Sequence, residues 1–362
     1  MDMLFKSIAS SGMDSEYVIH EINTFLANGG NINDESISKR TLLCHAIHYS
    51  RVSVVKELLK HKDIDVNKVS DDEPPLFTAF SWPNTEIIEA LLDHPNIDIH
   101  ASLSDDYPIV FKAIENDIVD AIRLLVKRPD FHVNIEYEGY PLLFDAIRRK
   151  RVEIVEVLLT REDLDINFKH LLTGDTPLHM AIYYDSIPIT KLLLARKDID
   201  VNVRTQDHYG AAAPLHLATQ RKEFEIFESL VDHPNIDVNV QDIGGYTPLL
   251  VLTDLKTVLK LRKLKKLLEH PKIEVDCVDN EGQNLAILVV HYLSQQSEQD
   301  MLRYSKFVFT YIEKLIEKGI HLLLPDNQGE TVVDVMKLLP PTMIAKLDNM
   351  VVEYLKKKVA IE

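Results

Sequence analysis

The sequence is organised around one unit that recurs every 33 to 37 residues. Its fullest copy is Thr176–Asn202, which opens with Thr-Pro-Leu-His-Met-Ala and closes with Asp-Ile-Asp-Val-Asn. The alanine of the opening motif marks the register, and it falls at Ala46, Ala79, Ala113, Ala146, Ala181 and Ala218, with Leu252 and Leu288 in the next two copies. The closing residue always lies 21 residues after the alanine, at Asn67, His100, Asn134, Asn167, Asn202 and Asn239. A constant unit with joints of variable length predicts a stack of rigid repeats.

Within each unit, the apolar residues are spaced as on one face of a short helix. Val52, Val55 and Leu58 illustrate this stripe. Thr176-Pro177 is typical of a helix start, since threonine caps free amides and proline fits the first turn. We therefore predict two antiparallel helices in each unit. Such a pair cannot bury its apolar face alone, so neighbouring units must stack.

These motifs resemble those of ankyrin-repeat proteins, whose pattern is T-P-L-H-x-A, then a V-x-x-L-L helix, then D-V-N. Thr176–Ala181 matches the opening in full, and Ala213–Ala218 and Thr247–Leu249 match it in part. The resemblance extends from about residue 12 to 336. The sequence departs from the family by lacking the glycine between the two helices. It also carries His-Pro-x-Ile before the closing motif, as in His233–Asn239.

The resemblance implies an all-α ankyrin-repeat solenoid of about nine to ten stacked helix–turn–helix units with hairpin-like tips. We expect a single domain, 1–362. Residues 1–34 would form an N-terminal capping unit and residues 35–288 the central repeats. Residues 289–362 would form atypical last repeats and a C-terminal capping helix.

Composition and motif searches point away from several other functions. The net charge of −17 disfavours nucleic acid and anionic membrane surfaces as partners. No apolar run approaches the ~18 residues that span a bilayer. Cys44 and Cys277 occupy non-equivalent positions, and no signal-peptide pattern opens the chain, so we expect a cytoplasmic protein without disulfides. Cys44 and His45 are sequence neighbours that cannot face one another on a helix. With no zinc spacing and no phosphate loop, we predict no enzyme activity, no cofactor and no metal site.

The family resemblance also implies a binding surface, because ankyrin stacks present variable residues on a concave face. Aromatic residues and arginine, which are enriched at binding hot spots, fill those positions in this sequence. The predicted partner-binding residues are Tyr49, Trp82, Tyr107, Tyr137, Tyr140, Arg148, Arg149, Tyr183, Tyr184, Tyr209, Arg221 and Tyr246. The competing interpretation is that these aromatic side chains only pack on the next repeat. The basic run 148–151 could hold an acidic peptide or a phosphate, or it could be a solvated turn.

We therefore predict a protein–protein interaction module that binds a specific protein partner and is itself a monomer. The alternatives are an enzyme or a membrane-associated adaptor. The adaptor would use the basic segment 256–266, which carries six basic residues and no acidic one, although a solvated outer helix explains that segment too. The degenerate repeats also resemble ankyrin proteins of protists and of bacteria that live inside eukaryotic cells. That resemblance suggests an effector secreted into the host cytoplasm that engages a host protein.

Overall fold

The computed structural model describes residues 2–10, 12–103, 105–207, 210–253 and 257–359. Contacts within the chain divide it into two compact units, Met1–Asp165 (unit 1) and Ile166–Glu362 (unit 2). Each unit is described by itself. The expectation of one uninterrupted domain stays a prediction.

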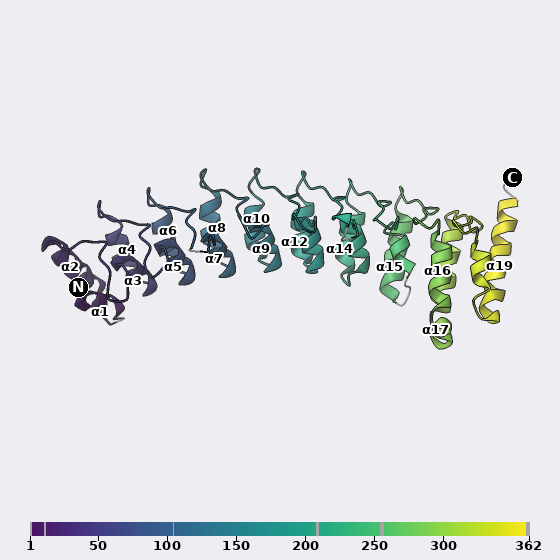
Figure 1. Ribbon diagram of the computed structural model, residues 1–362, viewed down its shortest axis with the longest axis horizontal. Helices are drawn as coiled ribbons and strands as arrows, with labels where there is room; N and C mark the ends of the chain where they lie inside the picture. The colour runs from purple at the N-terminus through teal and green to yellow at the C-terminus, as the bar shows by residue number, and fades with distance from the viewer. Residues whose placement is uncertain (1, 11, 104, 208–209, 254–256, 360–362) are drawn as a thin grey trace. The chain divides into compact units, whose positions relative to one another are not determined.

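Unit 1 is built from consecutive helix pairs (Figure 1). Its helices are α1 (Asp2–Ala9), α2 (Ser15–Ala27), α3 (Leu42–His48), α4 (Val52–Leu58), α5 (Pro75–Ser81), α6 (Thr85–Leu92), α7 (Val110–Glu115), α8 (Val119–Val126), α9 (Leu142–Arg148) and α10 (Val152–Leu158). First helices pack on first helices, in the order α1, α3, α5, α7 and α9, and second helices pack on second helices in the same way. The strands β1 (Glu136–Tyr137) and β2 (Tyr140–Pro141) pair antiparallel in the hairpin that precedes α9.

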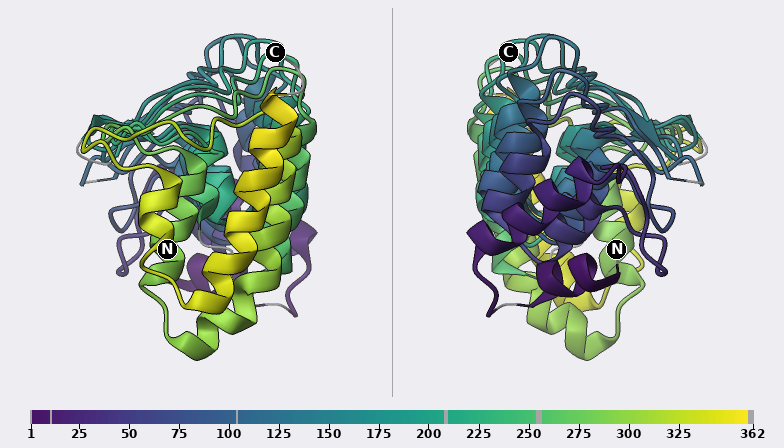
Figure 2. Two further views of the ribbon diagram at one scale, coloured as in Figure 1. Left: turned by 90° about the vertical axis from the view of Figure 1, so that its right-hand side faces the viewer. Right: turned by 90° about the vertical axis from the view of Figure 1, so that its left-hand side faces the viewer.

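Unit 2 repeats the same arrangement. Its helices are α11 (Pro177–Tyr183), α12 (Ile187–Leu194), α13 (Pro214–Gln220), α14 (Phe224–Val231), the 3₁₀ helix η2 (Leu250–Thr253), α15 (Val258–Glu269), α16 (Leu285–Ser294), α17 (Glu298–Glu317), α18 (Val332–Met336) and α19 (Pro341–Val359). The last pairs are longer, with 20 residues in α17 and 19 in α19. In the described part of the chain the helices form ten pairs, which confirms the predicted class of fold. Within each unit, successive hairpin loops project to one side of the helices (Figure 2).

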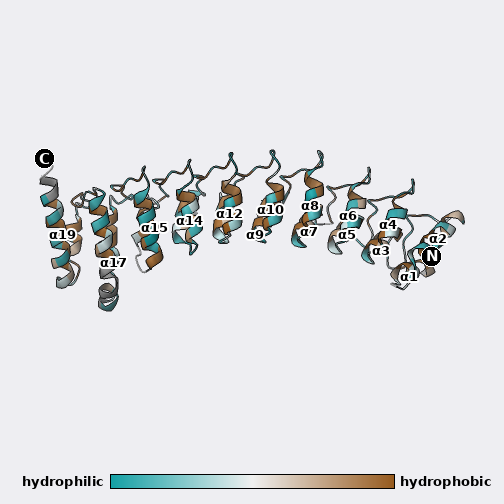
Figure 3. Ribbon diagram, turned by 180° about the vertical axis from the view of Figure 1, so that it is seen from behind, coloured by the Kyte–Doolittle hydropathy of each residue, from teal (hydrophilic) through white to brown (hydrophobic). Residues whose placement is uncertain are grey.

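The register alanines lie within the first helices, and all six are fully buried. The apolar stripes of the second helices, such as Val54, Val55 and Leu58 in α4, are buried as well. Hydrophobic and hydrophilic residues accordingly occupy different sides of individual helices (Figure 3). Because most of these helices have only seven or eight residues, too few to be stable alone, their stability comes from this packing.

The opening motif forms the helix start that its sequence predicts. The Thr176 hydroxyl caps α11, and His179 Nδ1 accepts the Thr176 N–H at 3.2 Å. The opposite ring nitrogen, Nε2, lies 3.2 Å from the carbonyl of Ala212, in the next repeat. Burial lowers the pKa of His179, which favours the neutral ring that this pairing needs. His216 binds the Tyr246 carbonyl in the same way at 2.8 Å, so both histidines bind the backbone of the following hairpin loop.

In four of the repeats, the turn between paired helices is made by a left-handed residue other than glycine. Ser50, Asp117, Lys150 and Asp185 adopt φ of 52°, 59°, 57° and 51° there. The residue after the turn donates its N–H to the register alanine carbonyl, as Arg151 does to Ala146 at 2.9 Å. A left-handed conformation costs a non-glycine residue about 1–2 kcal/mol. The hydrogen bond that closes the first helix offsets part of that cost.

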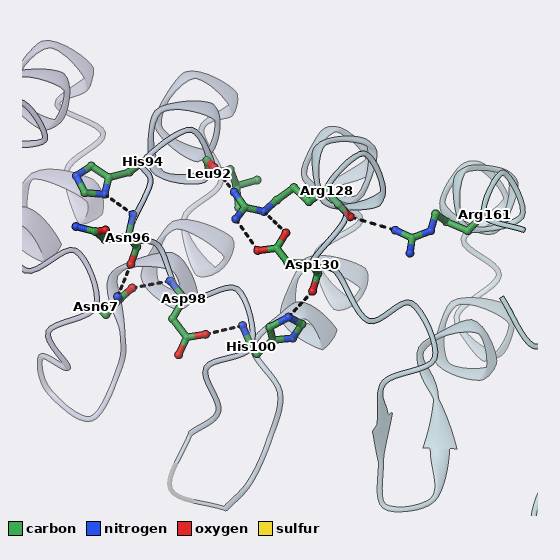
Figure 4. A network of polar contacts seen from close by, with 9 residues as sticks. All are labelled: Asn67, Leu92, His94, Asn96, Asp98, His100, Arg128, Asp130 and Arg161. Atoms are coloured by element: carbon green, nitrogen blue, oxygen red, sulfur yellow. Dashed lines mark hydrogen bonds and ion pairs between the residues drawn. The ribbon is translucent and has the colours of Figure 1, made fainter. Parts of the chain in front are cut away.

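A ladder of side-chain amides joins the closing motifs. Asn134 donates from Nδ2 to the Asp163 carbonyl at 2.7 Å, and its Oδ1 accepts the Asp165 N–H at 2.8 Å. In unit 1 the same pair of bonds is made by Asn33 and Asn67, and in unit 2 by Asn167, Asn202 and Asn239. At position 100 a histidine takes this place, and its Nε2 lies 2.7 Å from the Asp130 carbonyl (Figure 4). The closing asparagine therefore binds each repeat to the next.

We expect Asn134→Ala to weaken the joint between the last two repeats of unit 1. Two hydrogen bonds are lost, but both are exposed, so the cost should be about 1 kcal/mol. Amide hydrogen exchange at Asp165 should then accelerate about fivefold. Glu162→Ala, a substitution at an exposed residue of the same loop, is the control and should leave that rate unchanged. Equal rates in Asn134→Ala and the wild type would contradict the ladder.

Candidate functional site

The predicted binding residues lie at the carboxyl ends of the first helices and in the hairpin tips, and this surface of each unit is called the first-helix face below. Four of the aromatic side chains there are well exposed, namely Tyr49 at 43%, Trp82 at 52%, Tyr140 at 42% and Tyr183 at 58%. Tyr209 lies outside the described residues. Exposed aromatic side chains at successive repeats are the feature that a binding surface requires.

In unit 1, Trp82 is held by its neighbour on the preceding repeat. The His48 ring lies edge-on to Trp82, with 4.6 Å between ring centroids, and it also packs against Tyr49 at 4.9 Å. Burial, together with the charge of Arg40, lowers the pKa of His48, so this ring is neutral at physiological pH. Trp82 is followed by Pro83, and no left-handed residue ends this turn. The carbonyl of Phe80 at the end of α5 instead accepts a hydrogen bond from Asn116 Nδ2 at 2.7 Å. Trp82 is thus exposed but fixed.

Tyr107 and Tyr137 behave differently, because they pack on each other. Their ring centroids are 5.0 Å apart, and Phe111 lies about equally far from both, at 6.1 and 6.0 Å. Burial is the main cause that raises the pKa of Tyr107 to about 12. Tyr107 and Tyr137 therefore fit the competing interpretation, in which the aromatic side chains pack on the next repeat. Tyr140, on β2, stays exposed beside Phe144 at 6.3 Å.

The basic run at the end of α9 contains an ion-pair cluster that sequence analysis missed. Asp145 is buried, and it accepts hydrogen bonds from Arg148 Nη2 and, at 2.9 Å, from Arg149 Nε. Helical spacing brings these three residues together, at i, i+3 and i+4, although position 145 lies among core residues, where apolar side chains are the rule. The neighbouring Arg151 is engaged elsewhere, with Asp117 at 3.2 Å and the Glu115 carbonyl at 2.8 Å.

In unit 2, an arginine from one repeat covers a tyrosine from another. The Arg221 guanidinium lies over the Tyr183 ring at 4.6 Å, and Tyr184 meets Tyr183 edge-on at 5.2 Å. Such a stacked guanidinium keeps its charge while holding the ring in place. Tyr246 is only partly exposed, and its carbonyl accepts the hydrogen bond from His216. The structure therefore brings Tyr183, Tyr184 and Arg221 together.

Most basic residues of the segment 256–266 have partners within unit 2. Lys256 lies outside the described residues. Lys263 is fully buried and donates to the carbonyls of Ala218 at 2.7 Å and Thr219 at 3.1 Å, and to that of Arg221. It thereby closes the end of α13, where Arg221 is extended and no left-handed turn forms. The interpretation of this segment as a fully solvated outer helix was wrong for Lys263.

Other cations of α15 also have partners inside unit 2. Lys266 pairs with Asp232 at 2.8 Å, Lys265 with Glu269 at 3.7 Å, and Arg262 lies over Phe224 at 3.6 Å. This arrangement explains the basic pattern by packing and offers no support for a membrane-binding surface. No helix in the described part of the chain is both long and apolar enough to cross a membrane. The described residues also contain no group of three His, Cys, Asp or Glu side chains arranged to hold a metal ion.

Comparison with known proteins identifies the repeats. A family model described as ankyrin repeats (3 copies) matches residues 16–103 and 160–242. Among the solved structures that resemble the chain are two ankyrin-repeat proteins. The first, EF0377, an ankyrin repeat protein, is 23% identical over 58% of this chain and 97% of its own, with a TM-score of 0.48. The ankyrin repeat domain of Bcl-3, a member of the IkappaB protein family, is 20% identical over 72% of this chain and 97% of its own, with a TM-score of 0.39. No curated protein sequence matches the chain significantly.

The buried lysine predicts a specific pH dependence of stability. Burial is the first cause that lowers the pKa of Lys263 from 10.5 to about 8; the charge of Lys260 lowers it further, and that of Asp185 opposes the shift. Between these two values the unfolded chain retains a proton that the folded protein has lost, so stability must rise with pH. Relative to Lys263→Met, which has no proton to lose, the wild type should therefore gain stability from pH 8 to 10.5, measured by urea unfolding. Parallel stability curves for the two proteins would contradict this.

Proposed function

Because the chain belongs to the ankyrin-repeat family, we propose that it recognises one specific protein partner through the first-helix face of its repeats. Ankyrin repeats in general are protein–protein interaction modules. What supports this proposal most directly is the exposure of Tyr49, Trp82, Tyr140 and Tyr183 on equivalent surfaces of different repeats. Large aromatic side chains that remain exposed, and are held in place by neighbours, lose little entropy on binding and bury much surface.

The geometry supports a mechanism of preorganised docking without chemistry on the ligand. His48 fixes Trp82, and Arg221 fixes Tyr183, so a partner would meet side chains already in position. Arginines accompany the aromatic side chains, with Arg149 near Tyr107 in unit 1 and Arg221 over Tyr183 in unit 2. We further propose that the protein is cytoplasmic and monomeric, and that it is not an enzyme. Action inside a host cell, as an effector, remains a hypothesis that rests on the resemblance of the repeats alone.

The proposal is tested by capturing partners from a eukaryotic lysate with the whole chain and its variants, and identifying them by mass spectrometry. Trp82→Ala and Tyr183→Ala each remove an exposed ring, and at hot spots such truncations cost about 2 kcal/mol, or roughly 30-fold in affinity. The control is Tyr17→Ala on the second helix α2, where a tyrosine is 49% exposed away from the first-helix face. We expect a partner retained by the wild type and by Tyr17→Ala, and lost from Trp82→Ala or Tyr183→Ala.

The thermal stability of all three variants should stay close to that of the wild type, because each removed ring is about half exposed. A partner that binds Trp82→Ala and Tyr183→Ala as tightly as the wild type would contradict the proposal. Loss of that partner from Tyr17→Ala alone would indicate that the binding surface lies on the second helices.

A further inference from the structure

We propose that the groove between α17 and α19 in unit 2 is a second docking surface, which receives a basic amphipathic helix of a protein partner. The two long helices pack on each other near the C-terminal end of the chain (Figure 1). Both are the second helices of their pairs, so this surface is distinct from the first-helix face.

The groove has a volume of about 380 Å³ and an apolar floor. Ile316 comes from the last turn of α17, and Met350 and Tyr354 come from α19. Tyr354 is buried, and the other two side chains are half-buried. The lining residues of each helix are three or four positions apart and therefore lie on one side of it. The floor thus runs along two neighbouring helices.

Two carboxylates on α17 give the rim of the groove an uncompensated negative charge. Glu313 and Glu317 are exposed, and they lie about one helical turn apart. In the described part of the chain, neither side chain takes part in an ion pair or a hydrogen bond. The adjoining Lys314 and Lys318 pair with neither glutamate and do not line the groove.

The position of these two glutamates is unfavourable for the helix that carries them. Like charges at i and i+4 repel each other. Glu317 is also the last residue of α17, at the end where the helix dipole favours a cation over an anion. A cation supplied from outside the chain would relieve both effects.

The other charged residues that line the groove already have partners within unit 2. Lys346 Nζ lies over the Phe309 ring, 4.1 Å from its centroid. Glu353 pairs with Lys356 at 2.9 Å. The excess negative charge of the groove therefore comes from the glutamate pair of α17.

A groove between second helices in unit 1 has balanced charges instead. It lies between α6 and α8, and its charged lining residues are Asp93, Lys127, Arg128 and Asp130. Arg128 pairs with Asp130 at 2.8 Å and donates to the Leu92 carbonyl at 2.7 Å (Figure 4). An acidic rim beside an apolar floor is therefore particular to the α17–α19 groove, when these two grooves are compared.

An apolar floor with an acidic rim is complementary to a helix whose apolar stripe is flanked by lysine or arginine. Such helices dock through side chains at i, i+3, i+4 and i+7. An extended peptide would gain less, because the backbones of α17 and α19 are hydrogen-bonded within each helix and offer no strand edge. The negative charge also disfavours an anionic membrane surface.

A second copy of this chain does not offer a helix of this kind. Its own basic helix, α15, packs on α14 within unit 2. There Lys263 is fully buried, and Lys266 pairs with Asp232 at 2.8 Å. The partner that fits the groove is therefore a different protein.

The test measures the binding of labelled peptides to the full-length protein by fluorescence anisotropy. The probe is Leu-Lys-Lys-Leu-Leu-Lys-Lys-Leu-Leu-Lys-Lys-Leu-Leu-Lys-Lys-Leu, which places its leucines on one face of a helix. It should bind in a saturable way. The peptide with glutamate in place of each lysine should not bind. A peptide of the same composition with leucine and lysine in strict alternation has no helical stripe and should bind about fivefold more weakly or less tightly still.

Three variants locate the binding site. Glu313→Gln combined with Glu317→Gln removes both charges and keeps the shape, so it should weaken probe binding about fivefold or more. Met350→Ala shortens the floor and should weaken binding about threefold or more. The matched control is Glu153→Gln with Glu156→Gln, which removes the same net charge from two exposed residues of α10 in unit 1 and should change binding less than twofold.

Several results would overturn the proposal. Equal losses in the two double variants, or equal binding of the three peptides, would show general attraction to an acidic protein. Loss of probe binding from Trp82→Ala would place the peptide on the first-helix face, whereas unchanged binding keeps the two surfaces separate. Urea unfolding of the Glu313→Gln and Glu317→Gln double variant should occur at the wild-type concentration or higher. A lower concentration would mean that the pair serves the fold.

Other occupants of the groove would be recognised in the same experiments. Self-association of the wild type that Met350→Ala abolishes would assign the groove to a second copy of the chain. Binding to phosphatidylserine vesicles that Met350→Ala abolishes would assign it to a membrane. Either result overturns the proposal of a basic helix.

Discussion

The contact between one repeat and the next is the constraint on which the rest of this structure depends. Helices of seven or eight residues are too short to persist alone, so each exists only because its neighbours bury its apolar side. The register alanines are buried within the first helices, and the closing asparagines bind consecutive loops to one another. Buried packing supplies most of the stability and the amide ladder supplies registration. Exposed side chains can then vary from repeat to repeat without disturbing the fold.

The turns between paired helices show how variation at a functional surface is accommodated. Where Asp117 or Lys150 occupies the turn, a left-handed residue closes the first helix. Where the turn holds Trp82-Pro83, or follows Gln220, a side chain from the next repeat closes it instead, Asn116 in the first case and Lys263 in the second. Both of the turns closed in this way carry a candidate binding residue, Trp82 or Arg221. Tyr49 and Tyr183 are exposed beside turns closed by left-handed residues, so either way of closing the first helix accommodates a bulky exposed side chain.

Much of the candidate surface could be predicted from the sequence, because its positions follow from the repeat register. Tyr49, Trp82 and Tyr183 are exposed at the ends of first helices as expected. The partial burial of Tyr107 and Tyr137 was not predictable, since it depends on how two hairpin tips meet. Asp145 and Lys263 were missed because each is a polar residue in an apolar setting. What each one does is decided by atoms of other residues, the two guanidiniums that lie over Asp145 and the carbonyls that Lys263 caps.

The sequence by itself determined the period, the pairing of helices, the capping role of Thr176, and the family of the fold. These properties are written in local spacing and in short motifs, which repeat often enough to be recognised. Only the tertiary structure decided which aromatic rings stay exposed, which charges are paired, and that Lys263 is buried. Those properties depend on atoms from turns or repeats that are separated along the chain. Packing at such contacts is governed by shape and by the cost of desolvation, and a local sequence pattern contains neither.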